Sequence, residues 1–474
     1  MAFLIGGANS AADTAFSVDN SCRFNDGDSP RLLIANPTAG TRTKGTFSTW
    51  FKRGTFGSVQ YLFSTWNNSV SGYSSALILL RADDRLEVDN YVASGASGHS
   101  SVILDRLFRD PAAWYHVVVA WDTTQATDTN RYKIYVNGVQ ETDYNGTPAW
   151  PTEDQELFFN AGGTSNPQHI GFESVGSDQK YFDGYLAETV HIEGNALAAS
   201  SFGEFDEDSP TIWKAKDVSG LTFGNEGFYL DYEDSGDLGD DESGNGNDFA
   251  ETNLAATDQS TDTCTNNFAT LNPLYKDTNV TYSEGNLQHV NSASWEPGWS
   301  TIAVSSGKWY FESKFTAVTE SANNAFIGVC LVSEEDGLNL PGNSANSYGY
   351  ENNGNKKNNS SGTSYGNTWT VNDIVGCYLD LDNGAIYFSK NGTVQASGDP
   401  TSGASKTNAA YTFTPAGAYV LGISNYYGTQ QINYGNPVHS ISSGNSDPNG
   451  YGNFEYDESG YYALCTKNLA EIGG

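Results

Sequence analysis

Positive charge is scarce in this sequence. The 474 residues include 23 lysines and arginines against 57 aspartates and glutamates, a formal net charge of -34. Such a charge opposes approach to nucleic acid or to an anionic membrane surface, so we expect neither as a partner. No apolar run approaches the roughly 18 residues that span a bilayer, and no basic residue precedes the short apolar run at 3–5. We therefore expect no membrane insertion and no signal peptide.

Cysteine and histidine are also rare. The five cysteines are an odd number, widely spaced, without a Cys-x-x-Cys pair, and the six histidines follow no partner pattern. We interpret the cysteines as reduced thiols, with a zinc site or a disulfide framework as the alternatives. Reduced thiols are typical of a protein that is assembled in a cytoplasm.

Helical periodicity is nearly absent, whereas aromatic residues make up 13% of the chain and glycine accounts for 51 residues. Asn-Gly pairs recur along the sequence and favour the tight turns that join antiparallel strands. At 374–381 apolar residues alternate with others, which places Val375, Cys377 and Leu379 on one face of a strand. The sequence therefore predicts an all-β protein.

An acidic stretch divides the chain. Residues 217–275 contain 13 aspartates and glutamates and no lysine or arginine, a composition that indicates a connector rich in loops. We expect domains at 1–215 and 276–440, a connector at 216–275 and a C-terminal tail at 441–474. Each domain has a size that is usual for one β-sandwich.

The acidic stretch is also the only candidate cofactor site. Its carboxylate and amide oxygens are of the type that binds calcium, although they lack an ordered ligand spacing. The alternative to a calcium site is a solvated acidic surface. The candidate calcium ligands are Asp237, Asp240, Asp241, Asn245 and Asp248.

Four motifs in the N-terminal half occur in a fixed order. They lie at 47–53, 114–122, 131–138 and 182–188, and the third ends in Tyr-Val-Asn-Gly. Together they resemble the concanavalin A-like and laminin G-like family over about 16–200, which implies a jelly-roll sandwich. The family includes lectins and hydrolases, but the nearest match to a hydrolase carboxylate pair, at 204–208, lacks its last glutamate. We therefore expect no enzyme.

A second series of motifs follows the connector. Gly-Lys-Trp-Tyr-Phe-Glu at 307–312, Ile-Gly-Val at 327–329 and the Asp-Ile-Val-Gly run at 373–392 resemble the SPRY family over about 280–440. The resemblance implies a second antiparallel sandwich that binds a partner through loops on one rim. The fold class is thus two β-sandwiches, concanavalin A-like and then SPRY-like, joined by the acidic connector.

Candidate ligand-binding residues come from two loops of the SPRY-like region. The loops at 344–370 and 426–431 are rich in asparagine, glycine and tyrosine, a composition that is common at adaptable binding surfaces. The alternative is that they are ordinary polar loops. The candidate residues are Tyr365, Trp369, Tyr426, Tyr427 and Gln430.

The order of the two domains, with the phrases at 3–7 and 21–29, resembles virion surface and tail-fibre proteins of tailed marine bacteriophages. This resemblance implies a non-enzymatic tail fibre that binds a host surface glycan or protein. The alternative is a capsid or tail decoration protein that binds other virion proteins. The resemblance to bacteriophage proteins also implies a homo-oligomer, such as a trimer, located in a virion that is assembled in the host cytoplasm.

Overall fold

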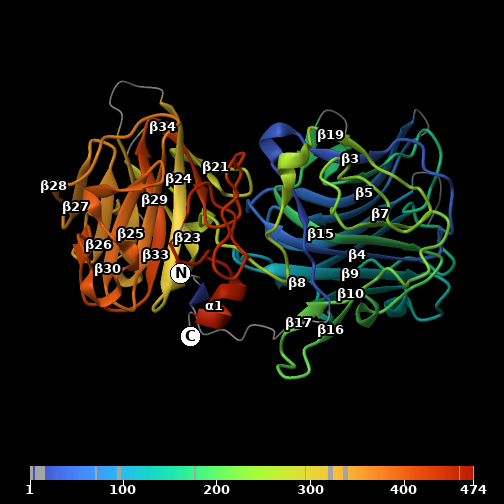
Figure 1. Ribbon diagram of the computed structural model, residues 1–474. Helices are drawn as coiled ribbons and strands as arrows, with labels where there is room; N and C mark the ends of the chain where they lie inside the picture. The colour runs from blue at the N-terminus through green and yellow to red at the C-terminus, as the bar shows by residue number, and fades with distance from the viewer. Residues whose placement is uncertain are drawn as a thin grey trace. The chain divides into compact units, whose positions relative to one another are not determined.

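The computed structural model describes residues 4–5, 16–69, 72–92, 98–175, 178–293, 295–318, 324–334, 340–457 and 459–472. Contacts divide the chain into two compact units. The N-terminal unit contains Ala11–Thr265, and the C-terminal unit contains Asn266–Gly474 together with Met1–Ser10. Figure 1 shows the strands of the first unit in blue to yellow-green and those of the second, apart from the blue β1, in yellow to red.

The N-terminal unit is an antiparallel β-sandwich. One sheet contains, in spatial order, β11 (Val139–Gln140), β10 (Tyr132–Val136), β9 (Trp114–Asp122), β4 (Lys44–Arg53), β15 (Gly184–Glu193), β2 (Ser21–Phe24) and β20 (Gln259–Ser260), and β18 (Phe228–Leu230) also pairs with β15. The other contains β19 (Ala250–Thr252), β3 (Arg31–Ile34), β12 (Gln168–Ile170), β5 (Gln60–Ser69), β6 (Gly72–Leu80), β7 (Arg85–Tyr91) and β8 (His99–Leu107).

Small hairpins and 3-10 helices also occur among the described residues of the N-terminal unit. The hairpins are β13 (Phe172–Val175) with β14 (Asp178–Tyr181), and β16 (Gly203–Phe205) with β17 (Trp213–Ala215). The 3-10 helices are η1 (Asp26–Asp28), η2 (Asp128–Asn130), η3 (Ala199–Ser201) and η4 (Ala256–Asp258).

Strand periodicity explains which side chains fill this sandwich. On β10, Tyr132, Ile134 and Val136 are buried and alternate with half-buried residues, as a strand with one core face requires. β4, β9 and β15 instead are buried along most of their length. A second cluster, in which Val190 of β15 and Phe202 are buried, covers the outer face of β9 and β15, and Trp50 of β4 belongs to a third cluster.

The acidic segment packs into the N-terminal unit and does not form a separate connector. β18, β19 and β20 pair with β15, β3 and β2, so three strands of the segment join the two sheets. Its sparse apolar residues, among them Phe228, Leu238 and Phe249, are buried in the core. The boundary between the units therefore lies after Thr265, whereas the sequence predicted boundaries at 215 and 275.

The C-terminal unit is the second sandwich. One sheet contains β1 (Leu4–Ile5), β23 (Glu296–Val304), β33 (Tyr419–Tyr426), β25 (Asn324–Leu331), β26 (Ser347–Glu351), β27 (Asn355–Asn358) and β28 (Ser361–Ser364). The other contains β21 (Val280–Ser283), β22 (Gln288–Asn291), β34 (Gly428–Asn433), β24 (Lys308–Val318), β29 (Ile374–Asp380), β30 (Ala385–Lys390) and β31 (Thr393–Val394), and β32 (Tyr411–Thr412) also pairs with β30. Among the described pairings, that of β1 with β23 is parallel and the other pairings of named strands are antiparallel.

The strand predicted at 374–381 is confirmed, and an Asn-Gly turn joins it to the next strand as a hairpin. β29 and β30 pair from Val375 with Lys390 to Asp380 with Ala385, and Val375, Cys377 and Leu379 are fully buried in the core. The turn between the strands places Gly384 at φ 67°, in the left-handed region that glycine tolerates. Asn-Gly turns and alternating side chains were therefore sufficient to place these strands.

The last segment of the chain belongs to the C-terminal sandwich, although the sequence predicted a separate tail at 441–474. Leu464 and Leu469 are buried in its core, and Phe454 is buried in an adjoining cluster. Residues 466–472 form α1 (Thr466–Ile472). The 3-10 helices of this unit are η5 (Pro273–Tyr275), η6 (Val332–Glu334), η7 (Gln395–Ser397) and η8 (Pro400–Ser405).

No helix in the described part of the chain has the length and hydropathy needed to cross a membrane.

Candidate functional site

Three aromatic side chains meet at the surface of the C-terminal sandwich. Trp295 directly precedes β23, Tyr426 ends β33, and Tyr427 connects β33 to β34. The ring centroids of Trp295 and Tyr426 are 5.5 Å apart, and those of Tyr426 and Tyr427 are 4.7 Å apart. All three residues are half-buried, so each keeps part of its surface in contact with solvent. We call these three residues the aromatic rim.

Buried groups support the aromatic rim from below. Phe326 of β25 is buried, and its ring centroid lies 5.5 Å from that of Trp295. The ammonium of Lys357 lies 5.2 Å from the centroid of the same Phe326 ring, a cation–π contact. The rim is therefore one edge of a continuous aromatic cluster that ends in a positive charge.

The backbone of the turn is fixed by its neighbours. Tyr427 has φ 53°, in the left-handed region, and it is followed by Gly428, where a Cβ would lie 2.9 Å from the Phe315 ring. The side-chain amide of Asn291 donates a 2.7 Å hydrogen bond to the carbonyl oxygen of Asn425, and Asn291 pairs with Gly428 in the sheet. Two sheets thus hold the turn, which reduces the entropy that a partner must remove on binding.

Of the five predicted ligand-binding residues, the structure brings Tyr426 and Tyr427 together at the surface and buries two others. Trp369 is 2% exposed and packs edge-on against Phe315 at 5.9 Å. Gln430 is fully buried, and its amide donates a 3.1 Å hydrogen bond to the Ser313 hydroxyl. Both side chains therefore stabilise the interior.

Tyr365, the fifth predicted residue, packs against other rings than those of the aromatic rim. It is half-buried and packs edge-on against Tyr350 at 5.6 Å and against Phe388 at 6.2 Å. The segment 344–370 that contains it was expected to be a loop, but β26, β27 and β28 form there. β27 is half-buried and β28 is exposed, and both consist of polar residues and glycine, which explains why composition alone indicated a loop.

Sequence reasoning missed Trp295. It stands four residues before Trp299, which is buried in β23, so strand periodicity gives no sign that one of the two indoles stays at the surface. The sequence did offer one signal for an exposed Trp295. The residue follows a short segment rich in serine and alanine, which is typical of a loop, and it comes directly before a strand.

The predicted calcium ligands serve as turn-forming groups. The Asp241 carboxylate accepts hydrogen bonds from the backbone N–H groups of Tyr229 at 2.9 Å and of Asn247 at 2.8 Å. The Asn245 amide donates to the carbonyl oxygen of Gly224 at 2.6 Å. The other three residues lie in the same turns. The Asp237 carboxylate accepts from the N–H of Gly239, and the Asp237 backbone carbonyl accepts from the N–H of Asp240. The Asp248 carboxylate accepts from the N–H of Asp241. Within the described ranges, no group of three His, Cys, Asp or Glu side chains is placed to hold a metal ion.

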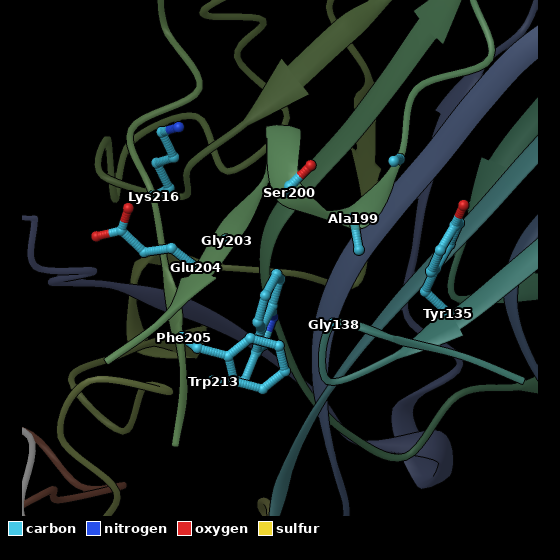
Figure 2. A pocket seen from close by; sticks show the side chains of 10 residues that line it. Tyr135, Gly138, Ala199, Ser200, Gly203, Glu204, Phe205, Trp213 and Lys216 are labelled. Atoms are coloured by element: carbon cyan, nitrogen blue, oxygen red, sulfur yellow. The ribbon is translucent and has the colours of Figure 1, made fainter. Parts of the chain in front are cut away.

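A pocket lies on the N-terminal unit, between the β16–β17 hairpin, η3 and β10. Its volume is about 400 Å³, and its lining includes the rings of Tyr135, Phe205 and Trp213. Figure 2 shows Glu204 and Lys216 on one side of the Trp213 indole and Tyr135 on the other. We call this the aromatic pocket.

A buried histidine fixes one wall of the aromatic pocket. The Trp213 indole N–H donates to His116 Nδ1 at 2.9 Å, and His116 Nε2 lies 2.8 Å from the Ser48 hydroxyl. Because the indole can only donate, Nδ1 is the acceptor and Nε2 carries the proton of a neutral imidazole. Burial lowers the pKa of His116 to about 3, which keeps the ring neutral.

Curated relatives match only part of the chain. The Ran-binding proteins 9/10 homolog of Drosophila melanogaster is 33% identical over 116 residues, 24% of this chain and 12% of the relative. Ran-binding protein 9 of Homo sapiens is 34% identical over 94 residues, 19% of this chain and 12% of the relative. This chain thus spans about an eighth of the length of these relatives.

These relatives contradict the prediction of a bacteriophage protein. They are Ran-binding proteins of a fly and a human, so the tail-fibre role, the decoration role and the virion location were wrong. The names of these relatives also give no support to virion proteins or host glycans as partners. The error arose because two sandwich domains in series recur with many functions, so their order does not identify the assembly that contains them.

Two solved structures are also similar to this chain. The SPRY domain of human HERC1 has a TM-score of 0.27 and 17% identity, and it covers 34% of this chain and 96% of that one. A second human SPRY domain has a TM-score of 0.26 and 16% identity, with coverages of 35% and 98%.

Two family profiles match the chain, one in each unit. Residues 26–201 match the concanavalin A-like lectin/glucanases superfamily, and residues 308–417 match the SPRY domain. The first range lies inside the N-terminal sandwich and the second inside the C-terminal sandwich. The chain therefore contains a concanavalin A-like domain followed by a SPRY domain, as the sequence motifs predicted.

Proposed function

We propose that this protein is a non-enzymatic binding protein whose SPRY sandwich recognises a protein partner through the aromatic rim. The observation that carries the proposal is the rim itself, since Trp295, Tyr426 and Tyr427 are three adjacent aromatic residues that are only half-buried. Tryptophan and tyrosine are the residues most enriched among those that dominate binding energy at interfaces. The names of the relatives, Ran-binding proteins, favour a partner that is a protein.

A role without catalysis agrees with the state of the buried histidines. In the Ser48–His116 pair, the imidazole carries its proton on the nitrogen that faces the hydroxyl, so it cannot accept the serine proton. Burial also lowers the pKa of His289 to about 4, and that ring bonds the Asn425 amide in the interior. These histidines therefore act in packing, and the proposal requires no cofactor.

Affinity capture with matched variants tests the proposal. The full chain is compared with Tyr426→Ala/Tyr427→Ala and with Leu274→Ala, which removes a side chain that is 49% exposed elsewhere on the same unit. A captured protein is then purified, and its affinity for all three chains is measured by calorimetry. We expect the double variant to bind at least about 10-fold more weakly, and the Leu274 variant to bind as the parent does.

Two outcomes would contradict the proposal. In the first, the double variant retains the partner with unchanged affinity while its thermal midpoint matches that of the parent. In the second, the only ligand recovered is a glycan. A double variant with a lowered thermal midpoint is replaced by Tyr426→Leu, which keeps an apolar side chain on β33.

A further inference from the structure

We infer that the aromatic pocket of the N-terminal unit binds a neutral aromatic side chain that a partner polypeptide presents. The pocket lies on the concanavalin A-like domain, so the inference goes beyond the proposed role of the SPRY sandwich. Its variants are also different, so its failure and the failure of the aromatic rim are distinguishable.

The walls of the pocket come from separate parts of the chain. Tyr135 is on β10, Phe205 ends β16 and Trp213 begins β17. The Phe205 and Trp213 rings are already packed edge-to-face, with centroids 4.9 Å apart. A third ring placed against them extends an arrangement that aromatic pairs prefer, worth about 0.5–1.5 kcal/mol per pair beyond the burial of area.

The Trp213 indole is held in place before any ligand arrives. Its N–H is bonded to His116, and the two rings are stacked with centroids 6.0 Å apart. Glycine occupies two positions against the indole, because a Cβ at Gly138 would lie 2.3 Å from the ring and one at Gly203 would lie 2.5 Å from it. A ligand therefore meets a rigid surface and does not have to order this side chain.

Charge in the pocket favours a neutral ligand. Glu204 lines the wall, but its carboxylate lies 3.6 Å from the ammonium of Lys214. Lys216 lies on the same side of the pocket as Glu204 (Figure 2). A bound cation would meet the Lys216 ammonium, and a bound anion would meet the Glu204 carboxylate, so neither sign of charge gains a net attraction.

Exposed apolar groups at the mouth point to a polypeptide as the carrier of the ring. Phe205 is 41% exposed, and Val139, next to Gly138 of the wall, is 54% exposed. A free small molecule in the pocket of about 400 Å³ would cover only the part of Phe205 that lines the wall, and it would leave Val139, which is outside the lining, in water. A polypeptide would cover them with the residues that flank its aromatic side chain, which is the usual role of apolar groups around an anchor pocket.

The test uses N-acetyl-L-tryptophanamide, a neutral indole with peptide groups on both sides, as the probe. Its binding to the full chain is followed by saturation-transfer NMR and by titration. The comparison probes are N-acetyl-L-leucinamide, choline and methyl β-D-glucoside, which represent an aliphatic side chain, an organic cation and a sugar. We expect the tryptophan amide to bind with a dissociation constant of about 1–10 mM and each comparison probe to bind at least about fivefold more weakly.

Two variants and a matched control locate the site. Phe205→Ala and Trp213→Leu each should weaken binding of the tryptophan amide at least about fivefold. Tyr91→Ala is the control, because Tyr91 is 41% exposed like Phe205 but lies on β7, outside the pocket lining. The Phe205 side chain is largely at the surface, so that variant remains informative if the Trp213 variant does not fold.

The inference is overturned if choline, the glucoside or the leucine amide binds as tightly as the tryptophan amide. It is also overturned if no probe shows saturation transfer, or if Phe205→Ala binds the tryptophan amide as the parent does.

Discussion

Buried ionisable side chains determine how the stability of this protein depends on pH. Glu188 lies at the β-bulge of β15, where the register shifts between Ala187 and Val190, and it is buried. The Tyr229 hydroxyl donates a 2.8 Å hydrogen bond to its carboxyl group. Burial, and to a smaller extent neighbouring acids such as Asp231, raises the pKa of Glu188 to about 8. The side chain is therefore protonated in the folded protein at neutral pH.

We predict that Glu188→Gln flattens the pH dependence of stability on the alkaline side. The pKa of this glutamate in the unfolded chain is about 4.3, so between that pH and about 8 only the folded state holds the proton. The free energy of unfolding then falls as pH rises, by about 1.4 kcal/mol per unit for this one group. Glutamine stays neutral, so the variant should match the parent near pH 4 and exceed it at pH 8.

Urea unfolding of both proteins from pH 4 to pH 9 checks this prediction. Other groups titrate equally in parent and variant, so the difference between the two curves isolates Glu188. A constant difference across the whole range would show that Glu188 is ionised in the folded state.

Strand β4 anchors the end of the acidic segment to the sandwich. Near its end, Lys52 is buried, and its ammonium lies 2.7 Å from the Asp262 carboxylate, which also accepts the Trp114 indole N–H at 3.0 Å. At its start, Lys44 forms a 3.4 Å pair with Asp122 but is 39% exposed. The same strand thus contributes to one buried ion pair, at Lys52, and to one ion pair that is partly exposed to solvent, at Lys44.

We predict very different costs for removing the two lysines. Lys52→Met leaves the Asp262 charge buried without its partner and should lower the free energy of unfolding by about 3–5 kcal/mol. Lys44→Met serves as the control and should cost about 0–1 kcal/mol, because water solvates that pair. Denaturant titration of the two variants measures both costs. Equal costs would mean that Asp262 finds another partner when Lys52 is removed.

The all-β fold and the strands beside Asn-Gly turns were predictable, whereas the candidate site was predictable only in part. Asn-Gly turns and alternation identified the β29–β30 hairpin because both signals are local. Burial of Trp369 and Gln430 depends on which sheet faces them, and that information is not local. The acidic segment was predicted to be a connector for a similar reason. Its many carboxylates dominate its composition, whereas a few widely spaced apolar residues such as Phe249 determine how it packs.

The boundary between the two units gives a prediction about the whole molecule. A fragment of residues 11–265 contains β18, β19 and β20 and should unfold cooperatively with native near-ultraviolet circular dichroism. A fragment of residues 1–215 lacks these strands and leaves Lys52 without Asp262, so it should have no cooperative transition. Thermal unfolding compares the fragments directly. A fragment 1–215 as stable as 11–265 would restore the acidic segment as a connector.

The central claim is that the SPRY sandwich recognises a protein partner through the aromatic rim. Hydrogen exchange measured by mass spectrometry, on the full chain with and without a purified partner, tests this claim most directly. We predict that protection on binding is greatest in peptides that contain Trp295 and the turn Tyr426–Tyr427, and that Tyr426→Ala/Tyr427→Ala abolishes it. Protection confined to other strands of the sandwich, with the rim peptides exchanging as in the free protein, would contradict the claim.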